Sequence, residues 1–275
     1  MNPNSDLFGY LKEKASWVRK ETLKIHKIAP ETRIASSLSA VEIFTTLFYG
    51  KVIQYDPTRT QWEERDRLII SKGHGAICFY PILADLGFFD REELQRVGQT
   101  GSFLGCIPDC IIPGFETTNG ALGHGLGVAC GISLGLKRKE RNEKVFVLLG
   151  DGELFEGSVW EAIMFAGEHK LDNLFAIVDR NRGCMLDFCE NVIDLDPLDE
   201  KLRNFGWKVE TADGHKIRQL HRVLMRWRDD KVRKPRILLA NTVKGKGVPT
   251  LETDPLSHVK NLRPEEIERI VAELE

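Results

Sequence analysis

Short runs of apolar and β-branched residues recur along the chain, separated by longer amphipathic stretches. Five such runs predict β-strands at residues 67–71, 144–149, 174–179, 208–211 and 236–243. The stretches between them carry apolar residues at helical spacing and predict helices over residues 76–86, 121–138, 156–169, 197–205 and 215–230. Strands that alternate with helices predict a mainly parallel sheet with helices on both faces, a three-layer α/β/α fold.

Helices are also predicted at both ends of the chain. Apolar residues spaced three and four apart over residues 11–25 form one helical face, and Pro30 ends that helix. A second helix is expected to begin near Ser39, with Ser39 as the N-cap and Glu42 completing a capping box. The tail over residues 264–274 is predicted to be helical, with proline in its first turn.

Composition restricts the class of protein. The 275 residues are 42% hydrophobic and 29% charged, which suits a buried core and is not typical of a disordered chain. The net charge of −2, from 39 basic and 41 acidic residues, argues against a nucleic-acid partner. No apolar run approaches the roughly 20 residues of a membrane span, and the N-terminus lacks an apolar signal core. We therefore expect a cytoplasmic protein, without a membrane partner, in which residues 1–275 form a single domain.

Six cysteines fit that compartment as reduced thiols. Two pairs of them, Cys106 with Cys110 and Cys184 with Cys189, lack the tight spacing of a zinc knuckle. We therefore favour buried thiols over a zinc site.

Two predicted strands end in polar residues that suit a cation. The second strand runs into Gly150-Asp151-Gly152, and the third ends two residues before Asn181. One crossover helix fits between them, so the two carboxyl ends can be neighbours at one edge of the sheet. Mg²⁺ binds few protein oxygens together with phosphate oxygens, and a carboxylate with an amide oxygen meets that demand. Gly-Asp-Gly alone is equally compatible with an ordinary turn, but the strand–helix–strand layout favours the metal site.

A glycine-rich helical stretch follows the sequence TTNG at residues 117–120. The N-terminus of a helix offers unpaired N–H groups and a positive partial charge, which suit a diphosphate. Four glycines spaced four apart predict close packing, either against a partner subunit or within the same domain: Gly123, Gly127, Gly131 and Gly135. The later segment KGKG at residues 244–247 is compatible with a phosphate contact or with a simple turn.

Several motifs, in this order, resemble the N-terminal, thiamine-diphosphate-binding domain of the transketolase family, in the half-length form made by split genes. The matching stretches include SKGHG at 71–75, PGFETTNGALGHG at 113–125, LLGDGELFEG at 148–157, DRNRG at 179–183, ADGH at 212–215 and NTVKGKGV at 241–248. The similarity covers essentially the whole chain. GDG followed by Asn is shared by all thiamine-diphosphate enzymes, whereas SKGHG, TTNGALG and VKGKGV are more particular to transketolases.

The resemblance implies that thiamine diphosphate is bound through Mg²⁺. The metal ligands that it implies are Asp151, Asn181 and the backbone carbonyl of Gly183. The cofactor-binding positions that it implies are Gly120, Leu122, Asp151, Gly152, Glu153, Asn181 and Met185, the last packed against the thiazolium ring. The catalytic positions that it implies are His74, His258 and Glu156, of which Glu156 corresponds to an acidic residue of the subunit interface.

The resemblance also implies a partner chain. In the family, the glutamate that activates the cofactor belongs to a pyrimidine-binding domain that follows this one, and the sequence stops at Glu275. We therefore expect a transferase that moves a two-carbon ketol unit from a ketose or ketose phosphate to an aldehyde-type acceptor. It is expected to be active only with a second chain that carries the pyrimidine-binding and C-terminal domains, in an α2β2 heterotetramer, with the glycine-lined helix as a contact surface.

Some positions depart from the family pattern. Arg33 and Ile107 stand where the family usually has histidines that touch substrate or cofactor, which points to non-standard substrates. One alternative is the α-type subunit of a 2-oxo acid dehydrogenase or decarboxylase complex, which shares GDG and Asn but not SKGHG or VKGKGV. Another is a catalytically impaired structural subunit, against which the intact Asp151 and Asn181 argue.

Overall fold

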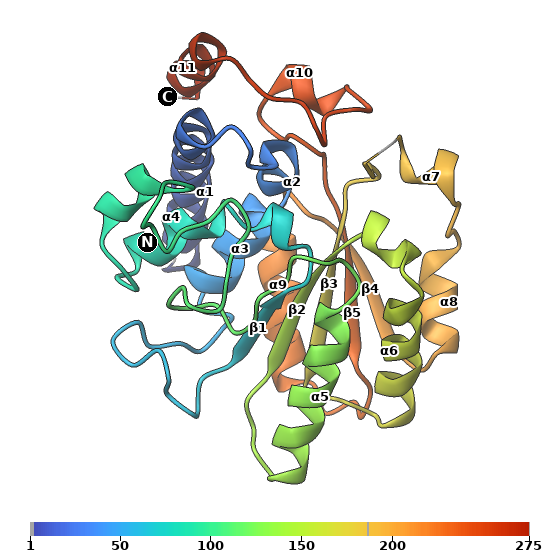
Figure 1. Ribbon diagram of the computed structural model, residues 1–275. Helices are drawn as coiled ribbons and strands as arrows, with labels where there is room; N and C mark the ends of the chain where they lie inside the picture. The colour runs from blue at the N-terminus through green and yellow to red at the C-terminus, as the bar shows by residue number, and fades with distance from the viewer. Residues whose placement is uncertain (1–2, 186, 275) are drawn as a thin grey trace.

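The structure, a computed structural model, describes residues 3–185 and 187–274 and is built around one five-stranded parallel sheet (Figure 1). The strands are β1 (Arg67–Ile70), β2 (Val145–Gly150), β3 (Leu174–Arg180), β4 (Lys208–Asp213) and β5 (Arg236–Asn241). Their order in the sheet is β1-β2-β3-β5-β4, and every pair of neighbours is parallel. All five predicted strands and the parallel sheet are therefore confirmed.

Helices pack on both faces of the sheet, as the alternating pattern predicts (Figure 1). The helices on one face are α1 (Pro3–Ile28), α3 (Val41–Phe48), α4 (Phe79–Asp85) and α9 (Ile217–Asp229). The helices on the other face are α5 (Gly125–Arg138), α6 (Gly157–Glu168) and α8 (Leu198–Asn204). Successive strand residues serve the two cores in turn: Phe146 and Leu148 join the first, Val145 and Val147 the second.

Short elements lie at and around the carboxyl ends of the strands. Figure 1 shows α2 (Ile34–Leu38), α7 (Cys189–Val192) and α10 (Pro249–Glu252) beyond the upper ends of the strands. The 3-10 turns are η1 (Gly73–Gly75), η2 (Arg91–Arg96) and η3 (Gly152–Phe155), and the last helix, α11 (Pro264–Glu273), packs on α1. Ligands of parallel sheets bind at this edge, so these loops are where a site is expected.

The capping box predicted at Ser39 and Glu42 was wrong. The N-cap of α3 is Ala40, and no side chain caps this helix. Ser39 Oγ instead donates to Asp179 Oδ2 at 2.6 Å, and the Glu42 carboxylate bonds to other buried groups. Both side chains form hydrogen bonds with partners far away in the sequence. A local motif cannot reveal such partners.

The glycine-rich helix begins at Gly125, later than the sequence pattern predicts. Gly123 precedes the helix with φ +84°, and a Cβ there would lie 2.6 Å from Ser158 Oγ, so this position requires glycine. The other three glycines face outward, with no atom within 4 Å of a built Cβ: Gly127, Gly131 and Gly135. Packing within the domain therefore does not explain these three.

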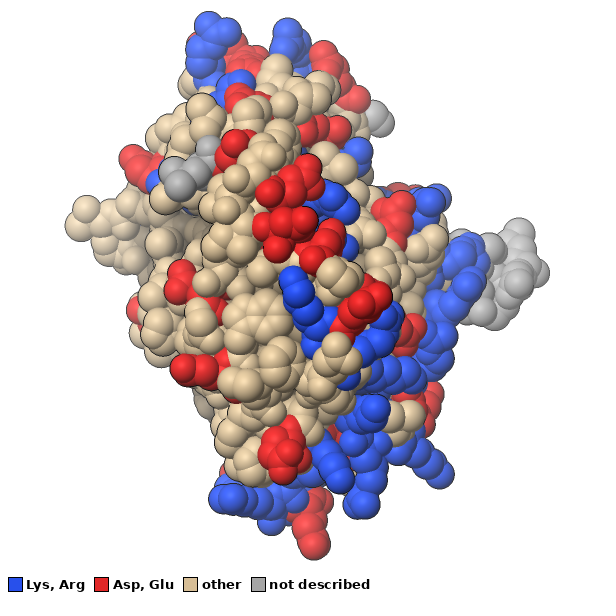
Figure 2. Space-filling model, turned by 90° about the vertical axis from the view of Figure 1, so that its right-hand side faces the viewer, with Lys and Arg blue, Asp and Glu red and all other residues tan. Residues whose placement is uncertain are grey.

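Charged side chains are unevenly spread over the surface although the net charge is only −2. On the face shown in Figure 2, Lys and Arg gather toward the lower right, and uncharged surface predominates on the left. Helix α6 lies on this side of the molecule in Figure 1, and it exposes the apolar residues Met164 and Phe165. The uncharged left part of this face in Figure 2 can be covered at a lower cost in buried unpaired charges than the rest.

None of the helices in the described part of the chain is long and apolar enough to cross a membrane. All six cysteines carry free thiols, and Cys78 and Cys130 are buried. Within residues 3–185 and 187–274, no group of three or more His, Cys, Asp and Glu side chains is placed to hold a metal ion. A cation site in this region must therefore draw on amide or backbone oxygens.

Candidate functional site

A cavity of about 310 Å³ opens beside the carboxyl ends of β2 and β3. Segments that follow β1, β2, β3 and β5 all contribute to its wall. The lining residues are Ser36, Lys72, His74, Leu122, Gly150, Asp151, Gly152, Glu153, Phe155, Glu156, Asn181, Gly183, Cys184, Met185, Val192, Lys244 and His258. Since β2 and β3 are hydrogen-bonded neighbours, the two strand ends predicted to approach each other do so.

Asp151 stands at the end of β2 with its carboxylate buried. Oδ1 accepts the N–H of Gly152 at 2.9 Å, and Oδ2 accepts the N–H of Arg182 from the loop after β3. Burial, reinforced by the negative charge of Asp179, raises the pKa of the Asp151 carboxyl from 3.8 to about 6. A carboxylate in this position is costly to ionise unless a cation lies next to it.

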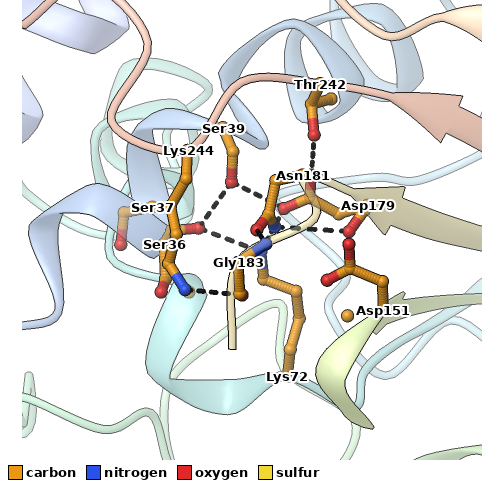
Figure 3. A network of polar contacts seen from close by, with 12 residues as sticks. Ser36, Ser37, Ser39, Lys72, Asp151, Asp179, Asn181, Gly183, Thr242 and Lys244 are labelled. Carbon is orange, nitrogen blue, oxygen red and sulfur yellow. Dashed lines mark hydrogen bonds and ion pairs between the residues drawn. The ribbon is translucent and has the colours of Figure 1, made fainter. Parts of the chain in front are cut away.

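The loop after β3 supplies two further oxygens. Asn181 Oδ1 accepts the N–H of Gly183 at 3.1 Å, and the Gly183 carbonyl accepts from Lys244 Nζ at 2.7 Å. Figure 3 shows Asn181, Gly183 and Asp151 close together at the ends of β2 and β3. One carboxylate, one amide oxygen and one carbonyl oxygen form the donor set of a hard cation such as Mg²⁺, so these residues fit the implied metal.

A buried ion pair lies beside the cavity, at the carboxyl ends of β1 and β3. Lys72 Nζ pairs with Asp179 Oδ2 and donates to the Ser36 carbonyl at 2.9 Å. The hydroxyls of Ser39 and Thr242 also donate to the Asp179 carboxylate (Figure 3). Burial opposes the ionisation of Asp179, but Lys72 and the two hydroxyls outweigh it and hold the pKa of this carboxyl below its usual value. The segments that carry Ser39, Lys72 and Thr242 are thereby fixed to the carboxylate that β3 carries.

Lys244 was not assigned a role from the sequence. Besides Gly183, its ammonium group bonds to the Cys184 carbonyl at 3.2 Å and to His258 Nδ1 at 3.2 Å. Burial and the nearby charge of Lys72 lower the pKa of Lys244 to about 8. At neutral pH the amine of Lys244 is therefore protonated in most molecules. The KGKG segment did not separate a phosphate contact from a turn, and the family-like stretch NTVKGKGV at 241–248 carried no role for this lysine.

His74 and His258 lie next to each other in the cavity wall, with ring centroids 5.0 Å apart and an interplanar angle of 56°. Burial, aided by Lys72, lowers the pKa of His74 to about 2. Burial, aided by Lys244, lowers the pKa of His258 to about 4, so both rings are neutral near pH 7. Because His258 Nδ1 accepts from the Lys244 ammonium, we assign the ring proton of His258 to Nε2.

Glu153 and Glu156 differ in what their carboxylates do. Glu153 Oε1 accepts the N–H of Gly123 at 2.9 Å, and Oε2 accepts the N–H of Gly150 at 3.1 Å. Ser71 Oγ also donates to Glu153 Oε1, so this buried carboxylate joins the start of α5 to the end of β2. Glu156 is exposed at the N-cap of α6 and lines the cavity.

Of the remaining positions predicted to bind the cofactor, some line the cavity and one does not. Leu122, Gly152 and Met185 line the cavity, and the Met185 side chain is 56% exposed. Gly120 is exposed and is not among the lining residues. Two amide groups at the start of the glycine-rich helix already have acceptors, because Gly123 and Gly125 donate to Glu153 and Ser71.

Arg33 and Ile107 lie outside the lining of the cavity. After burial and Lys244, the charge of Arg33 also lowers the pKa of His258, which places this guanidinium within electrostatic reach of the cavity. Ile107 is 49% exposed, and its Cγ2 lies 3.7 Å from the Cβ position built on Gly73, beside His74. Ile107 therefore lies next to the segment that carries His74.

A family model described as the thiamine diphosphate binding domain of transketolase matches residues 25–274. The chain belongs to this family. It is 37% identical over 276 residues to an apulose-4-phosphate transketolase subunit of Actinobacillus succinogenes, covering 100% of this chain and 99% of that protein. It is 35% identical over 266 residues to the 6-deoxy-6-sulfo-D-fructose transketolase subunit SqwG of a Clostridium species, covering 96% of each.

Full-length transketolases match over a smaller share of their length. Human transketolase is 33% identical over 273 residues, which are 99% of this chain and 43% of that protein. The solved transketolase of Campylobacter jejuni superposes with a TM-score of 0.87 at 27% identity, covering 96% of this chain and 42% of that one. Family membership confirms the predicted fold, the thiamine diphosphate cofactor and the class of transketolase-type transferase.

Proposed function

We propose that this chain is the cofactor-binding subunit of a two-chain transketolase that moves a two-carbon ketol unit from a ketose to an aldehyde-type acceptor. The observation that carries the proposal is the donor set of Asp151, Asn181 and Gly183 at adjacent strand ends. The match to proteins named as transketolase subunits, over nearly their whole length, supports the division into two chains. The free thiols of all six cysteines favour a cytoplasmic location.

The cavity offers contacts for each part of the cofactor. Asp151, Asn181 and the Gly183 carbonyl would hold Mg²⁺, and Lys244 would move from Gly183 to the diphosphate, which is the stronger acceptor. Leu122 and Met185 offer apolar surface for the thiazolium. When bound, thiamine diphosphate supplies the carbon that takes up the ketol unit, and the protein binds and orients the reactants.

His74 and His258 are proposed to contact substrate. Their lowered pKa values keep both rings neutral, so each can donate one hydrogen bond to a substrate hydroxyl without adding charge. His258 would donate from Nε2, because Lys244 occupies its Nδ1. Glu156 lies at the mouth, where a carboxylate can contact a partner chain.

Exposed apolar side chains support docking of a second chain over the mouth and along the α5–α6 face. Met185 and Val192 line the cavity, Phe188 pairs with the lining residue Gly183, and Ile107 lies near Gly73. Leu256 and Val259 flank His258 in the chain, and all six side chains are exposed. Those on α5 and α6 are Val128, Met164 and Phe165, beside the open glycines of α5. Several exposed apolar residues gathered around one cavity mark a protein interface. We propose that the partner carries the pyrimidine-binding and C-terminal domains and that the assembly is α2β2.

The substrates are proposed to lie outside the ordinary pentose phosphates. Arg33 adds a guanidinium near the cavity, which suits an anionic ketose such as a phosphate or sulfonate. Ile107 offers no hydrogen bond next to the segment that carries His74, so a hydroxyl placed there would lose a partner. Two of the similar proteins are named for apulose 4-phosphate and for 6-deoxy-6-sulfo-D-fructose. No observation favours a 2-oxo acid as the substrate.

Reconstitution tests the proposal directly. The purified chain and its partner chain are assayed separately and together for ketol transfer, with ketose phosphates and sulfonates as donors and with pyruvate as a control. We expect turnover only from the mixture, only with thiamine diphosphate and Mg²⁺, and not with pyruvate. Ketol transfer by this chain alone, or decarboxylation of pyruvate by the mixture, would contradict the proposal.

A further inference from the structure

The loop that carries Lys244 is held at several backbone points. The N–H of Gly245 donates to the Ala35 carbonyl at 2.9 Å, and two further points lead to one buried carboxylate. On one side of Lys244, the N–H of Val243 donates to His215 Nε2 at 2.8 Å. On the other side, the carbonyl of Lys246 accepts from Arg19 Nε at 2.8 Å. The loop between them follows β5, and His215 follows β4, its parallel neighbour in the sheet.

One carboxylate joins these two anchors. Glu42 Oε2 bonds to His215 Nδ1 at 2.9 Å, and Glu42 Oε1 bonds to Arg19 at 2.8 Å. Burial opposes the ionisation of Glu42, but the bond from His215 and the charge of Arg19 hold the pKa of this carboxyl below its usual value. The chain Arg19–Glu42–His215 therefore joins α1 and α3 to both ends of the loop by charge-assisted bonds.

The direction of these bonds fixes the state of His215. Since Nε2 accepts the N–H of Val243, it carries no proton, and the single ring proton lies on Nδ1, where it is donated to Glu42. The ring therefore donates one hydrogen bond, to Glu42, and accepts one, from Val243. A side chain that can only donate or only accept would keep just one of these two bonds. Arg19 is close-fitting as well, because a Cβ on Gly247 would lie 2.6 Å from Arg19 Cδ.

We infer that His215 is a positioning residue for cofactor binding: with Glu42 and Arg19 it holds the loop so that the Lys244 ammonium faces the metal and diphosphate site. The inference rests on the proposed function. Lys244 has its head group 2.7 Å from the Gly183 carbonyl, and it depends on a loop with left-handed glycines on either side of Lys246. Without an anchor at Val243, the loop would be fixed on only one side of Lys244, through Gly245, and the lysine would be less firmly directed. Groups that orient ligands in this way commonly change affinity about 10–100-fold.

Two substitutions separate positioning from general stability. In His215→Gln, the side-chain oxygen reaches the place of Nε2 and still accepts from Val243. In His215→Asn, the amide reaches the place of Nδ1 and still donates to Glu42, but Val243 loses its acceptor. Each variant loses one hydrogen bond, and the bond lost in His215→Gln is the one to the charged Glu42. We therefore expect His215→Gln to lower the melting temperature at least as much as His215→Asn, so general stability alone would not weaken binding more in His215→Asn.

The experiment measures the affinity of the full chain for thiamine diphosphate with Mg²⁺ by calorimetry. In parallel, deuterium exchange of residues 242–248 is followed by mass spectrometry without cofactor. We expect His215→Asn to weaken binding about tenfold and to speed exchange of the loop, and His215→Gln to stay close to the wild type. In a Lys244→Met background, the difference in affinity between the two variants should vanish, because the histidine acts through that lysine.

The outcomes are distinguishable. Equal affinity and equal exchange in the Asn and Gln variants would overturn the inference, and so would a tenfold difference that persists without Lys244. A wild-type chain that binds no cofactor, combined with faster loop exchange in His215→Asn alone, would refute the proposed function and still support the anchoring of the loop by His215.

Discussion

At the scale of single residues, Asp151 links metal binding to pH. Its folded pKa of about 6 lies above the usual 3.8, so between these values the folded chain binds more protons than the unfolded chain. The metal-free chain should therefore lose stability as the pH rises from about 4 to about 6, by about 3 kcal/mol from this group. Urea unfolding at several pH values, compared between the wild type and Asp151→Asn, isolates this contribution from those of the histidines.

The same carboxylate must be ionised to bind a cation. We expect the affinity for Mg²⁺ and thiamine diphosphate to fall with decreasing pH below about 6, and Asp151→Asn to abolish metal-dependent binding at every pH. Calorimetry over this range measures both effects. An Asp151→Asn chain that bound the cofactor with unchanged affinity would disprove the assignment of this ligand.

Lys244 gives a second prediction at this scale. Lys244→Met should weaken cofactor binding about ten- to hundredfold, because a hydrogen bond to a charged group contributes about 1.5–3 kcal/mol. Lys246→Met is the matched control: its ammonium pairs with Glu252, and its side chain is 39% exposed. Equal affinities of these two variants, measured by calorimetry, would exclude a role for the Lys244 ammonium.

The sequence identified Asp151 and Asn181 but not Lys244, for a physical reason. A carboxylate between two glycines at the end of an apolar strand is a local pattern. Lys244 acquires its role from Gly183, which is 61 residues away, and the KGKG pattern by itself does not separate a phosphate contact from a turn. The neutral state of the two cavity histidines was likewise out of reach, because it follows from burial in the folded chain.

At the scale of elements, helix α5 contains glycines that lower its helix propensity, and three of them lie on a face with no neighbouring atoms. Gly131 lies inside the helix with no atom near a built Cβ, so Gly131→Ala should stabilise the isolated chain by about 1 kcal/mol. For a chain of this size that corresponds to a rise of about 2–4 °C in melting temperature. If the partner chain packs on this face, the same substitution should weaken the complex.

Calorimetric melting of the chain and sedimentation of the mixed subunits measure these opposite effects. Gly87→Ala is a contrasting control, because Gly87 also has open space but a φ of +86°, so alanine there is strained. A complex of unchanged strength in Gly131→Ala would show that the partner docks elsewhere.

Strands were easier to predict than the ends of helices. Parallel strands that are buried on both faces appear as continuous apolar runs, as in β2, β3 and β5. The edge strand β4 is only partly buried, but all five strands begin within one residue of the predicted position. The helix caps failed where side chains serve distant partners: Ser39 bonds to Asp179 across 140 positions instead of capping α3. Local motifs are reliable only where no tertiary contact competes for the same side chain.

At the scale of the whole molecule, cofactor and metal should stabilise the chain even without its partner, because they bind only the folded state. At a concentration one hundred times the dissociation constant, the gain is about 2.7 kcal/mol. Adding a chelator should remove the part that depends on the metal. Thermal melting with thiamine diphosphate, Mg²⁺, both, or both with chelator tests this, and identical melting in all four conditions would contradict cofactor binding by this chain.

The carboxylate of Asp179 has a consequence for synthesis on the ribosome. Its partners Ser39 and Lys72 are made before it, but Thr242 comes 63 positions later, just after β5, which must insert beside β3. Until that last strand emerges, one side of β3 has no neighbour, and Asp179 lacks the Thr242 hydroxyl, one of its three side-chain donors. Truncated translation products therefore cannot assemble a working pocket, and only a chain finished past residue 242 can take up the vitamin.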